Sequence, residues 1–212
     1  KGHISSLNYR HLSVGIFLTS IMAIANYFLI AFFNTFLVET QGLPLRSVML
    51  VNTIAISIQV IITVCMGRVS DFVGRKKVLG AGIVTLGLSI LPIFWLLTQH
   101  DIYLALVGEI WFALAAGTLT GVVPTMLAEL FDTYHRNMGI SISYNVALAL
   151  FGGTAPLVAI TLVASTHNVF APAWYLMAVA LLALLALRSL GEAYQPETFD
   201  RAIDQKVDAT VS

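Results

Sequence analysis

The chain has 212 residues, of which 58% are hydrophobic and 10% charged, and its mean hydropathy is +0.87. Because a soluble globular domain carries about 25% charged residues, lipid is the expected surrounding of most of this sequence. The net charge is zero, which leaves no basic field for nucleic acid and excludes that class of partner. The single cysteine, Cys65, offers neither a disulfide nor a CxxC metal site and is expected to pack in an apolar run. We expect no metal and no cofactor.

The stretch before the first apolar segment is polar and does not resemble a signal peptide. It begins with Lys1 and not with methionine, so we expect that sequence upstream of it has been removed. It forms a lead-in at residues 1–11.

Six long apolar segments follow in chain order. They lie at about 12–38, 46–67, 78–98, 102–130, 137–164 and 170–190. Each is close to or above the roughly 20 residues that a helix needs to cross about 30 Å of hydrocarbon. A backbone in lipid must bond to itself, so each segment is predicted to be helical, and the short polar breaks make neighbours antiparallel. The sequence predicts an all-α membrane protein, with a transmembrane bundle at 12–190 and a soluble tail at 191–212.

The basic residues predict the orientation of the bundle. Six crossings bring both termini to the same side, and ten of the eleven basic residues then share that side. These ten are Lys1, Arg10, Arg68, Arg75, Lys76, Lys77, Arg136, Arg188, Arg201 and Lys206, whereas Arg46 lies opposite. Lys and Arg are retained on the cytoplasmic side of inserted helices, so we expect cytoplasmic termini in a multi-pass protein of the cell membrane.

Two cytoplasmic connections carry recognisable motifs. The loop GRVSDFVGRKK resembles the signature of the major facilitator superfamily, in which a Gly, an Asp and a Gly-Arg-basic-basic run join two helices. The matching residues are Gly67, Asp71, Gly74, Arg75, Lys76 and Lys77. Phe72 departs from the pattern, because the family usually has Arg or Lys there. The stretch AELFDTYHRNMG resembles the metabolite:proton symporter branch, with Asp132 in place of the usual Pro. FGGTAPLVA and APAWYLMAVA also resemble that branch, especially its proline/betaine-type members.

The resemblance runs from about Tyr9 to Thr198 and implies helices 7 to 12 of a twelve-helix transporter. The implied fold is a C-terminal half-bundle of two inverted three-helix repeats. Its partner would be an N-terminal six-helix half of the same chain, or a second copy. The implied function is proton-coupled symport of a small polar metabolite by alternating access, with a zwitterionic osmolyte such as proline or betaine, or a small organic acid, as substrate. The alternative is a non-transporting six-helix scaffold, sensor or self-associating half-transporter.

Other six-helix classes lack their required residues. The five histidines fall at segment ends or in loops, so no nucleophile and base can meet within the membrane as in an intramembrane protease. Paired NPA motifs of a water channel and PxDxxK-like repeats of a mitochondrial-type carrier are absent from the sequence. We therefore expect a protein that is not an enzyme.

The first motif predicts a gate at the cytoplasmic side. Asp71 and Arg75 are four residues apart and face one another on a helical turn, while Gly74 permits a tight bend. Arg75 could then pair with Asp71 or with Glu129. The resemblance implies a latch between helix ends that favours an outward-open state, and the alternative is an anchor that contacts only lipid headgroups. The candidate gate residues are Gly67, Asp71, Gly74, Arg75, Glu129 and Arg136.

Polar residues recur at helical spacing in the first, second, fourth and fifth segments, and we expect these faces to look onto a shared aqueous path. The candidates are Asn26, Tyr27, Asn34, Asn52, Gln59, Glu109, Thr120, Ser141 and Asn145, which could contact substrate or bond between helices. Glu109 is the candidate with the strongest functional signal, because inserting an acidic side chain at mid-membrane costs roughly 2.5 to 3.5 kcal/mol. It could act in transport or gating, or reach the outer interface or bond a neighbouring Ser or Tyr. The third and sixth segments have few polar residues and are expected to face lipid.

Overall fold

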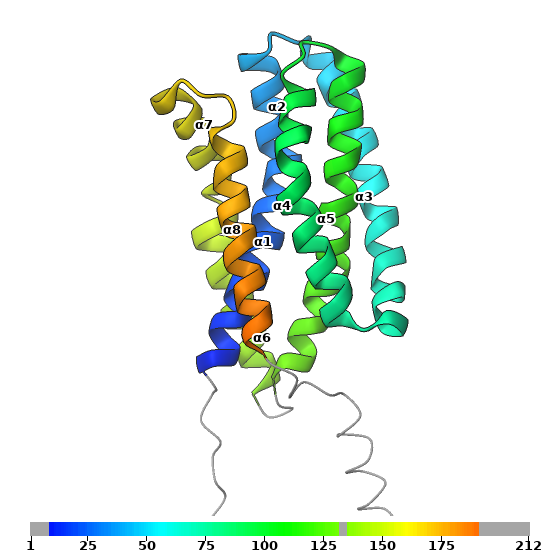
Figure 1. Ribbon diagram of the computed structural model, residues 1–212, viewed down its shortest axis with the longest axis vertical. Helices are drawn as coiled ribbons and strands as arrows, with labels where there is room; N and C mark the ends of the chain where they lie inside the picture. The colour runs from blue at the N-terminus through cyan, green and yellow to red at the C-terminus, as the bar shows by residue number, and fades with distance from the viewer. Residues whose placement is uncertain (1–8, 132–134, 191–212) are drawn as a thin grey trace, which may run out of the picture.

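The computed structural model describes residues 9–131 and 135–190, and within these ranges it contains helices and no strand. Six spans are long and apolar enough to cross a membrane, which confirms the six predicted segments. They are Tyr9–Thr40, Leu45–Val73, Arg75–Leu97, Ile102–Leu130, Arg136–Thr166 and Ala171–Ser189. The spans form one elongated bundle whose described ends, Tyr9 and Leu190, lie at the same end (Figure 1). The tail and most of the lead-in lie outside the described residues.

Two spans depart from regular α-helix. The first consists of α1 (Tyr9–Tyr27), the π-helical turn η1 (Phe28–Phe32), α2 (Phe33–Thr35) and a second π-helical turn, η2 (Phe36–Thr40). The fifth consists of α6 (Arg136–Ala147), the π-helical turn η3 (Leu148–Gly152) and α7 (Ala155–Thr166). The other four spans are α3 (Leu45–Val73), α4 (Arg75–Leu97), α5 (Ile102–Leu130) and α8 (Ala171–Ser189). Single π-helical turns inside a helix often occur at functional sites.

Local chemistry explains where the spans end. The Asp101 carboxylate caps α5 by accepting hydrogen bonds from the backbone N–H groups of Tyr103 at 2.7 Å and Leu104 at 3.4 Å. Gly74 separates α3 from α4 with a φ of 102°, a conformation that an L side chain rarely adopts. The glycine of the motif therefore sets the turn that brings the ends of α3 and α4 together.

The helix contacts repeat within the bundle. α3, the second of the first three spans, packs against α5, the first of the last three, and the α6–α7 span, the second of the last three, packs against α1. In the same way α4 packs against α5, and α8 packs against α1. The pairs α1 with α5 and α4 with α8 complete the pattern. Because α1 and α5 start at opposite ends of the bundle, these contacts are those of two inverted three-helix repeats (Figure 1).

An aromatic cluster fills the interior around the π-helical turns of the first span. Phe28, Phe32, Phe33 and Phe36 are fully or almost fully buried. The Phe33 ring meets Phe112 of α5 edge-on at 4.8 Å between centroids, a favourable geometry for two aromatic rings. The remaining ring partners are Phe94 of α4 and Tyr175 of α8. This cluster fixes the first span against three other helices.

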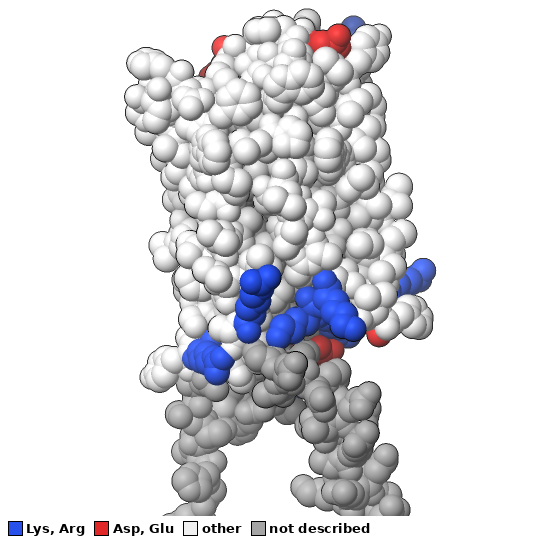
Figure 2. Space-filling view, in the orientation of Figure 1, with Lys and Arg blue, Asp and Glu red and all other residues white. Residues whose placement is uncertain are grey.

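Basic side chains gather at the end of the bundle where α1 begins, and we call this the basic end (Figure 2). Its described residues are Arg10, Arg68, Arg75, Lys76, Lys77, Arg136 and Arg188. Arg46 lies at the opposite end, beside the start of α3. The clustering predicted from the sequence is therefore present in the fold.

Candidate functional site

A charge network at the basic end joins the motif loop to α5. The Arg75 guanidinium donates to Asp71 at 3.0 Å and forms a second, closer ion pair with Glu129. It also donates to the backbone carbonyl of Thr125 at 3.2 Å. The network lies beside a cavity of about 610 Å³ that Ser70, Gly74, Lys76 and Lys77 also line. Arg75 thus pairs with both carboxylates that the sequence offered as alternatives.

A second polar group lies in the interior around Glu109, which has no exposed surface. The Asn52 side-chain amide donates to Glu109 Oε2 at 3.0 Å and to the Leu29 carbonyl of η1 at 2.6 Å. The Asn34 amide donates to Asn52 Oδ1 at 3.2 Å. Glu109 is therefore buried and does not extend to the outer interface. Its hydrogen-bond partner is the Asn52 amide, and not a Ser or Tyr hydroxyl as the sequence analysis allowed. We call these three residues the glutamate network.

The glutamate network contains two buried oxygens that lack a donor. Neither Glu109 Oε1 nor Asn34 Oδ1 has a hydrogen-bond partner among the described residues. Buried polar atoms are normally satisfied, and an unpaired buried charge costs considerably more than an unpaired neutral group. Both atoms are acceptors, so a hydrogen-bond donor would satisfy them.

A third polar group joins the same three spans, the first, second and fourth, at a level closer to the basic end. Gln59 donates its amide to Asn26 Oδ1 at 2.7 Å, and Asn26 donates to Thr120 Oγ1 at 3.0 Å. The Thr120 hydroxyl donates in turn to the Ala116 carbonyl at 2.9 Å. This chain of bonds leaves no orphan atom at Asn26. It connects α1, α3 and α5 about two helical turns from the glutamate network.

Two glycines allow α3 and α5 to approach closely beside these groups. A methyl group at Gly117 would lie 2.9 Å from the Gln59 carbonyl oxygen, and one at Gly121 would overlap the Thr63 carbonyl. Such contacts are typical of GxxxG packing between membrane helices. Gly67 of the motif faces Gly121 from α3, where a methyl group would meet the Gly121 carbonyl at 3.5 Å. The glycines bring the polar side chains of both helices within bonding distance.

The structure does not bring the remaining candidates into these groups. Ser141 and Asn145 are exposed on α6, and Asn145 donates only to the Ser141 carbonyl, at 2.8 Å. Tyr27 is partly exposed and its ring packs on Gly152 of η3. Arg136 is exposed and forms no ion pair with the described residues. Asp132, where the second motif departs from its family, lies outside the described residues.

The extent to which each span is buried within this chain does not follow the number of polar residues that it carries. Of the six spans, α3 and the α6–α7 span are the least buried within this chain, although both carry polar faces. α4 and α8 are buried to a greater extent against α5, α1 and each other, and their contact with lipid stays a prediction. Cys65 is exposed on α3, contrary to the expected packing, because α3 contacts the bundle along one face only.

Sequence reasoning missed the backbone partners of the site. The Leu29 and Thr125 carbonyls accept bonds from Asn52 and Arg75, and the identity of a side chain carries no signal for such a role. The π-helical turns were also missed, since they have no compositional signature. The position of the Thr125 carbonyl one turn before Glu129 is the only indirect clue, because residues four apart share a helix face.

Known proteins resemble this chain over most of its length. The chain is 29% identical to a protein of Staphylococcus haemolyticus named as a candidate proline/betaine transporter, over 79% of this chain and 36% of that protein. It is 29% identical to the ectoine/proline transporter ProP of Corynebacterium glutamicum, over 89% of this chain and 37% of that protein. It is also 29% identical to a citrate-proton symporter of Salmonella typhi, over 86% of this chain and 42% of that protein.

The chain therefore spans somewhat more than a third of the length of these curated relatives. The model of the Major Facilitator Superfamily matches residues 16–209, which include all six spans in whole or in large part. Together with the repeated helix contacts and the six apolar spans, this match shows that the chain is a multi-pass membrane protein and that it belongs to the major facilitator superfamily.

Proposed function

We propose that this chain is the C-terminal six-helix half of a proton-coupled symporter that carries a small polar metabolite by alternating access. The substrate is a zwitterionic osmolyte of the proline or betaine kind, or a small organic acid, as the names of the relatives suggest. The partner is an N-terminal six-helix half or a second copy of the chain. The seven described cations at the basic end support cytoplasmic termini in the inner membrane.

The observation that carries the proposal is the buried Glu109 with one unpartnered oxygen. An acid inside a membrane protein marks an ion or proton pathway by default, because its charge is costly there. Binding of a proton to Glu109 removes that charge, and release of the proton restores it. The energetics of the α1, α3 and α5 interface therefore change with each proton bound or lost. We assign Glu109 as the proton-carrying residue of this half.

The charge network at the basic end supplies the proposed cytoplasmic gate. Arg75 holds the end of α3, through Asp71, and the end of α5, through Glu129, in one arrangement. Gly67 and Gly74 allow the close approach and the turn on which that arrangement depends. The intact network favours the outward-open state, and its rupture accompanies opening toward the cytoplasm. Arg136 is proposed to join the gate from α6.

The substrate pathway is proposed to follow the polar faces that the chain exposes. Tyr27, Ser141 and Asn145 are at least partly exposed, and they offer hydroxyl and amide groups without a fixed charge. The buried Asn52 and Gln59, with the half-buried Asn26, Asn34 and Thr120, position Glu109 and the helices that carry it. Amide and hydroxyl groups suit a zwitterion better than a molecule of high net charge, since neither end of a zwitterion requires a single fixed counter-charge.

A transport assay on the full-length protein tests the proposal. The protein is reconstituted in proteoliposomes, and uptake of labelled proline, betaine and citrate is followed with an inside-alkaline pH gradient and after a protonophore collapses it. We expect gradient-driven accumulation of at least one compound. Glu109→Gln should abolish accumulation while substrate exchange across the membrane continues, because exchange requires no net proton movement.

Glu109→Asp serves as the matched control, because it keeps a titratable carboxyl at the same place and should retain part of the accumulation. Accumulation that is unchanged in Glu109→Gln would refute the role of Glu109. Absence of both uptake and exchange for all three compounds would favour the alternative function, a non-transporting scaffold or sensor.

A further inference from the structure

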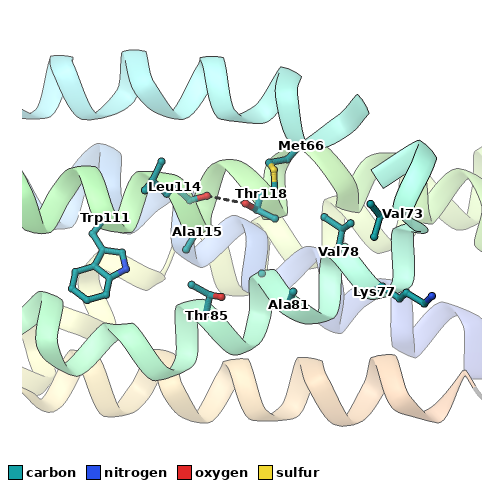
Figure 3. A pocket seen from close by; sticks show the side chains of 11 residues that line it. Met66, Val73, Lys77, Val78, Ala81, Thr85, Trp111, Leu114, Ala115 and Thr118 are labelled. Carbon is teal, nitrogen blue, oxygen red and sulfur yellow. Dashed lines mark hydrogen bonds between the residues drawn. The ribbon is translucent and has the colours of Figure 1, made fainter. Parts of the chain in front are cut away.

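An apolar groove runs along the outside of the bundle between α3 and α4, with α5 as its floor (Figure 3). Its volume is about 460 Å³. Met66 and Val73 line it from α3, Ala81 and Thr85 from α4, and Trp111 and Leu114 from α5. The groove exists because α3 and α4 pack mainly against α5 and little against each other beyond their shared turn. It opens to the surroundings of the helices, which are lipid in a membrane-spanning bundle.

Lys77 stands at the end of the groove that lies near the turn between α3 and α4 (Figure 3). The same residue also lines the cavity at the basic end, so the apolar groove and the charged cavity meet at its side chain. Arg75 forms ion pairs with Asp71 and Glu129, whereas the Lys77 side chain forms no ion pair or hydrogen bond with the described residues. The charged residues lining the cavity are three cations and two carboxylates, which leaves one positive charge in excess.

The length of the groove matches one leaflet of a bilayer. Gly82 lies five positions after Lys77 along α4 and packs against Thr118 of α5. Trp111 lies seven positions before Thr118 along α5. At 1.5 Å per residue these twelve steps span about 18 Å. Half of a hydrocarbon core about 30 Å thick is close to this length. An extended chain that starts at Lys77 would thus end beside Trp111 near the middle of the membrane.

The groove wall has few polar side chains, namely Lys77, Thr85 and Thr118, which favours a hydrocarbon occupant over a polypeptide. The Thr118 hydroxyl donates to the Leu114 carbonyl at 2.9 Å, and the helical backbone bonds are satisfied within each helix. A peptide in the groove would leave its own N–H and C=O groups without partners in an apolar setting, which is costly. An acyl chain has no such groups.

We propose that this groove binds a glycerophospholipid of net negative charge, with its phosphate at Lys77 and one acyl chain laid along α5 to Trp111. The headgroup enters the mouth of the charged cavity, and the excess positive charge there selects an anionic lipid over a zwitterionic one. A single Lys near an anionic lipid surface contributes about 1 kcal/mol, equivalent to about fivefold in binding. The site lies between α3 and α4 on the outside of the bundle and does not depend on the transported substrate.

Quenching of Trp111 fluorescence by brominated lipids tests this site in the full chain. Trp95→Phe and Trp174→Phe leave Trp111 as the single tryptophan of these 212 residues, and any tryptophan of the proposed N-terminal half is replaced by Phe as well. The protein is placed in bilayers in which phosphatidylglycerol with brominated acyl chains competes with plain phosphatidylcholine, and the labels are then exchanged. We expect phosphatidylglycerol to be preferred about fivefold at Trp111. Lys77→Gln should reduce the preference to near one, and Lys77→Arg should retain it.

Two further variants separate the groove from diffuse attraction to the basic end. Arg68→Gln removes an exposed cation of the same end that lines neither the groove nor the cavity, and it should leave the preference intact. Ala81→Phe fills the groove at an exposed position and should weaken quenching by both lipids. Equal quenching by the two lipids in the parent protein, or an equal loss in Arg68→Gln and Lys77→Gln, would overturn the proposal. Quenching unchanged by Ala81→Phe would mean that the acyl chain does not occupy the groove.

Discussion

The side chain of Asn52 bridges the Glu109 carboxyl and the backbone of the first span, since its amide donates to Glu109 Oε2 and to the Leu29 carbonyl. Leu29 belongs to the π-helical turn η1, so a buried acid of α5 is linked to the irregular part of the first span through a residue of α3. A change in the charge of Glu109 therefore acts directly on the segment where the first span departs from regular helix. This arrangement gives the proposed proton site a mechanical connection to a neighbouring helix.

Removal of the Asn52 amide should destabilise the bundle. Asn52→Ala leaves both oxygens of Glu109 without a donor among the described residues, and a buried unsatisfied polar group costs about 1 to 3 kcal/mol, more if it is charged. Thermal unfolding of the detergent-purified protein should show a clear loss of stability. Asn145→Ala is the matched control, because Asn145 is exposed and bonds only within α6, and it should unfold close to the parent temperature.

The two asparagine variants can also be combined with Glu109→Gln. A neutral side chain at position 109 no longer suffers an uncompensated charge, so the cost of Asn52→Ala should be smaller in that background. The double-mutant cycle should therefore show a coupling between positions 52 and 109, and none between 145 and 109. Additive effects for both pairs would show that the Asn52 bond does not stabilise Glu109.

Much of this fold follows from constraints that act on the sequence directly. A helix in lipid must be long and apolar, so the six spans, and the breaks at Gly74 and Asp101, could be located from composition and spacing. Seven-residue spacing likewise placed Asn52 and Gln59 on one face of α3, and both are buried there and bonded across the interface. The spacing argument succeeds where the packing partner of that face supplies polar groups.

The same spacing argument placed Ser141 and Asn145 on a pathway that the structure does not join to the other groups. α6 packs mainly on α1, with the buried Ser143 against Gly15, and Ser141 and Asn145 lie on its exposed surface. Periodicity identifies a face but does not indicate which neighbour covers it. That choice depends on tertiary packing, as do the backbone acceptors and the register shift that forms each π-helical turn.

The close approach of α3 and α5 predicts opposite effects for two glycine substitutions. Gly121→Ala places a methyl group against the Thr63 carbonyl, and overpacking of this kind costs about 1 to 3 kcal/mol. Gly153→Ala meets nothing closer than the Leu148 carbonyl at 3.6 Å, and the φ of −63° at Gly153 suits any residue. Alanine restricts the unfolded chain more than glycine does, so this substitution should leave stability unchanged or raise it by up to about 1 kcal/mol. Thermal unfolding of the two variants checks this contrast, and equal destabilisation would argue against the GxxxG contact.

The orientation of the bundle predicts which side of the membrane each connection faces. Glu39 and Arg136 are exposed at opposite ends of the bundle, so cysteines introduced there should react with a membrane-impermeant thiol reagent from opposite sides. Cys65→Ser provides the background, since the only native cysteine is exposed on α3. In intact cells Glu39→Cys should be labelled and Arg136→Cys protected until the membrane is permeabilised. Labelling of Arg136→Cys alone in intact cells would reverse the orientation.

The two ion pairs of Arg75 should differ in strength, because their carboxylates differ in exposure. The Asp71 side chain is 54% exposed, and an ion pair at such a surface is worth about 0.2 to 1 kcal/mol. Glu129 is 31% exposed, so its coupling to Arg75 should be the larger and should persist better at high salt. Double-mutant cycles from Arg75→Gln with Asp71→Asn and with Glu129→Gln measure both couplings by thermal unfolding at low and high ionic strength. Arg46→Gln, at the opposite end, is the control and should couple to neither carboxylate. A larger coupling to Asp71 would mean that the Arg75–Asp71 pair within the motif turn stabilises the gate more than the Arg75–Glu129 pair between α4 and α5 does.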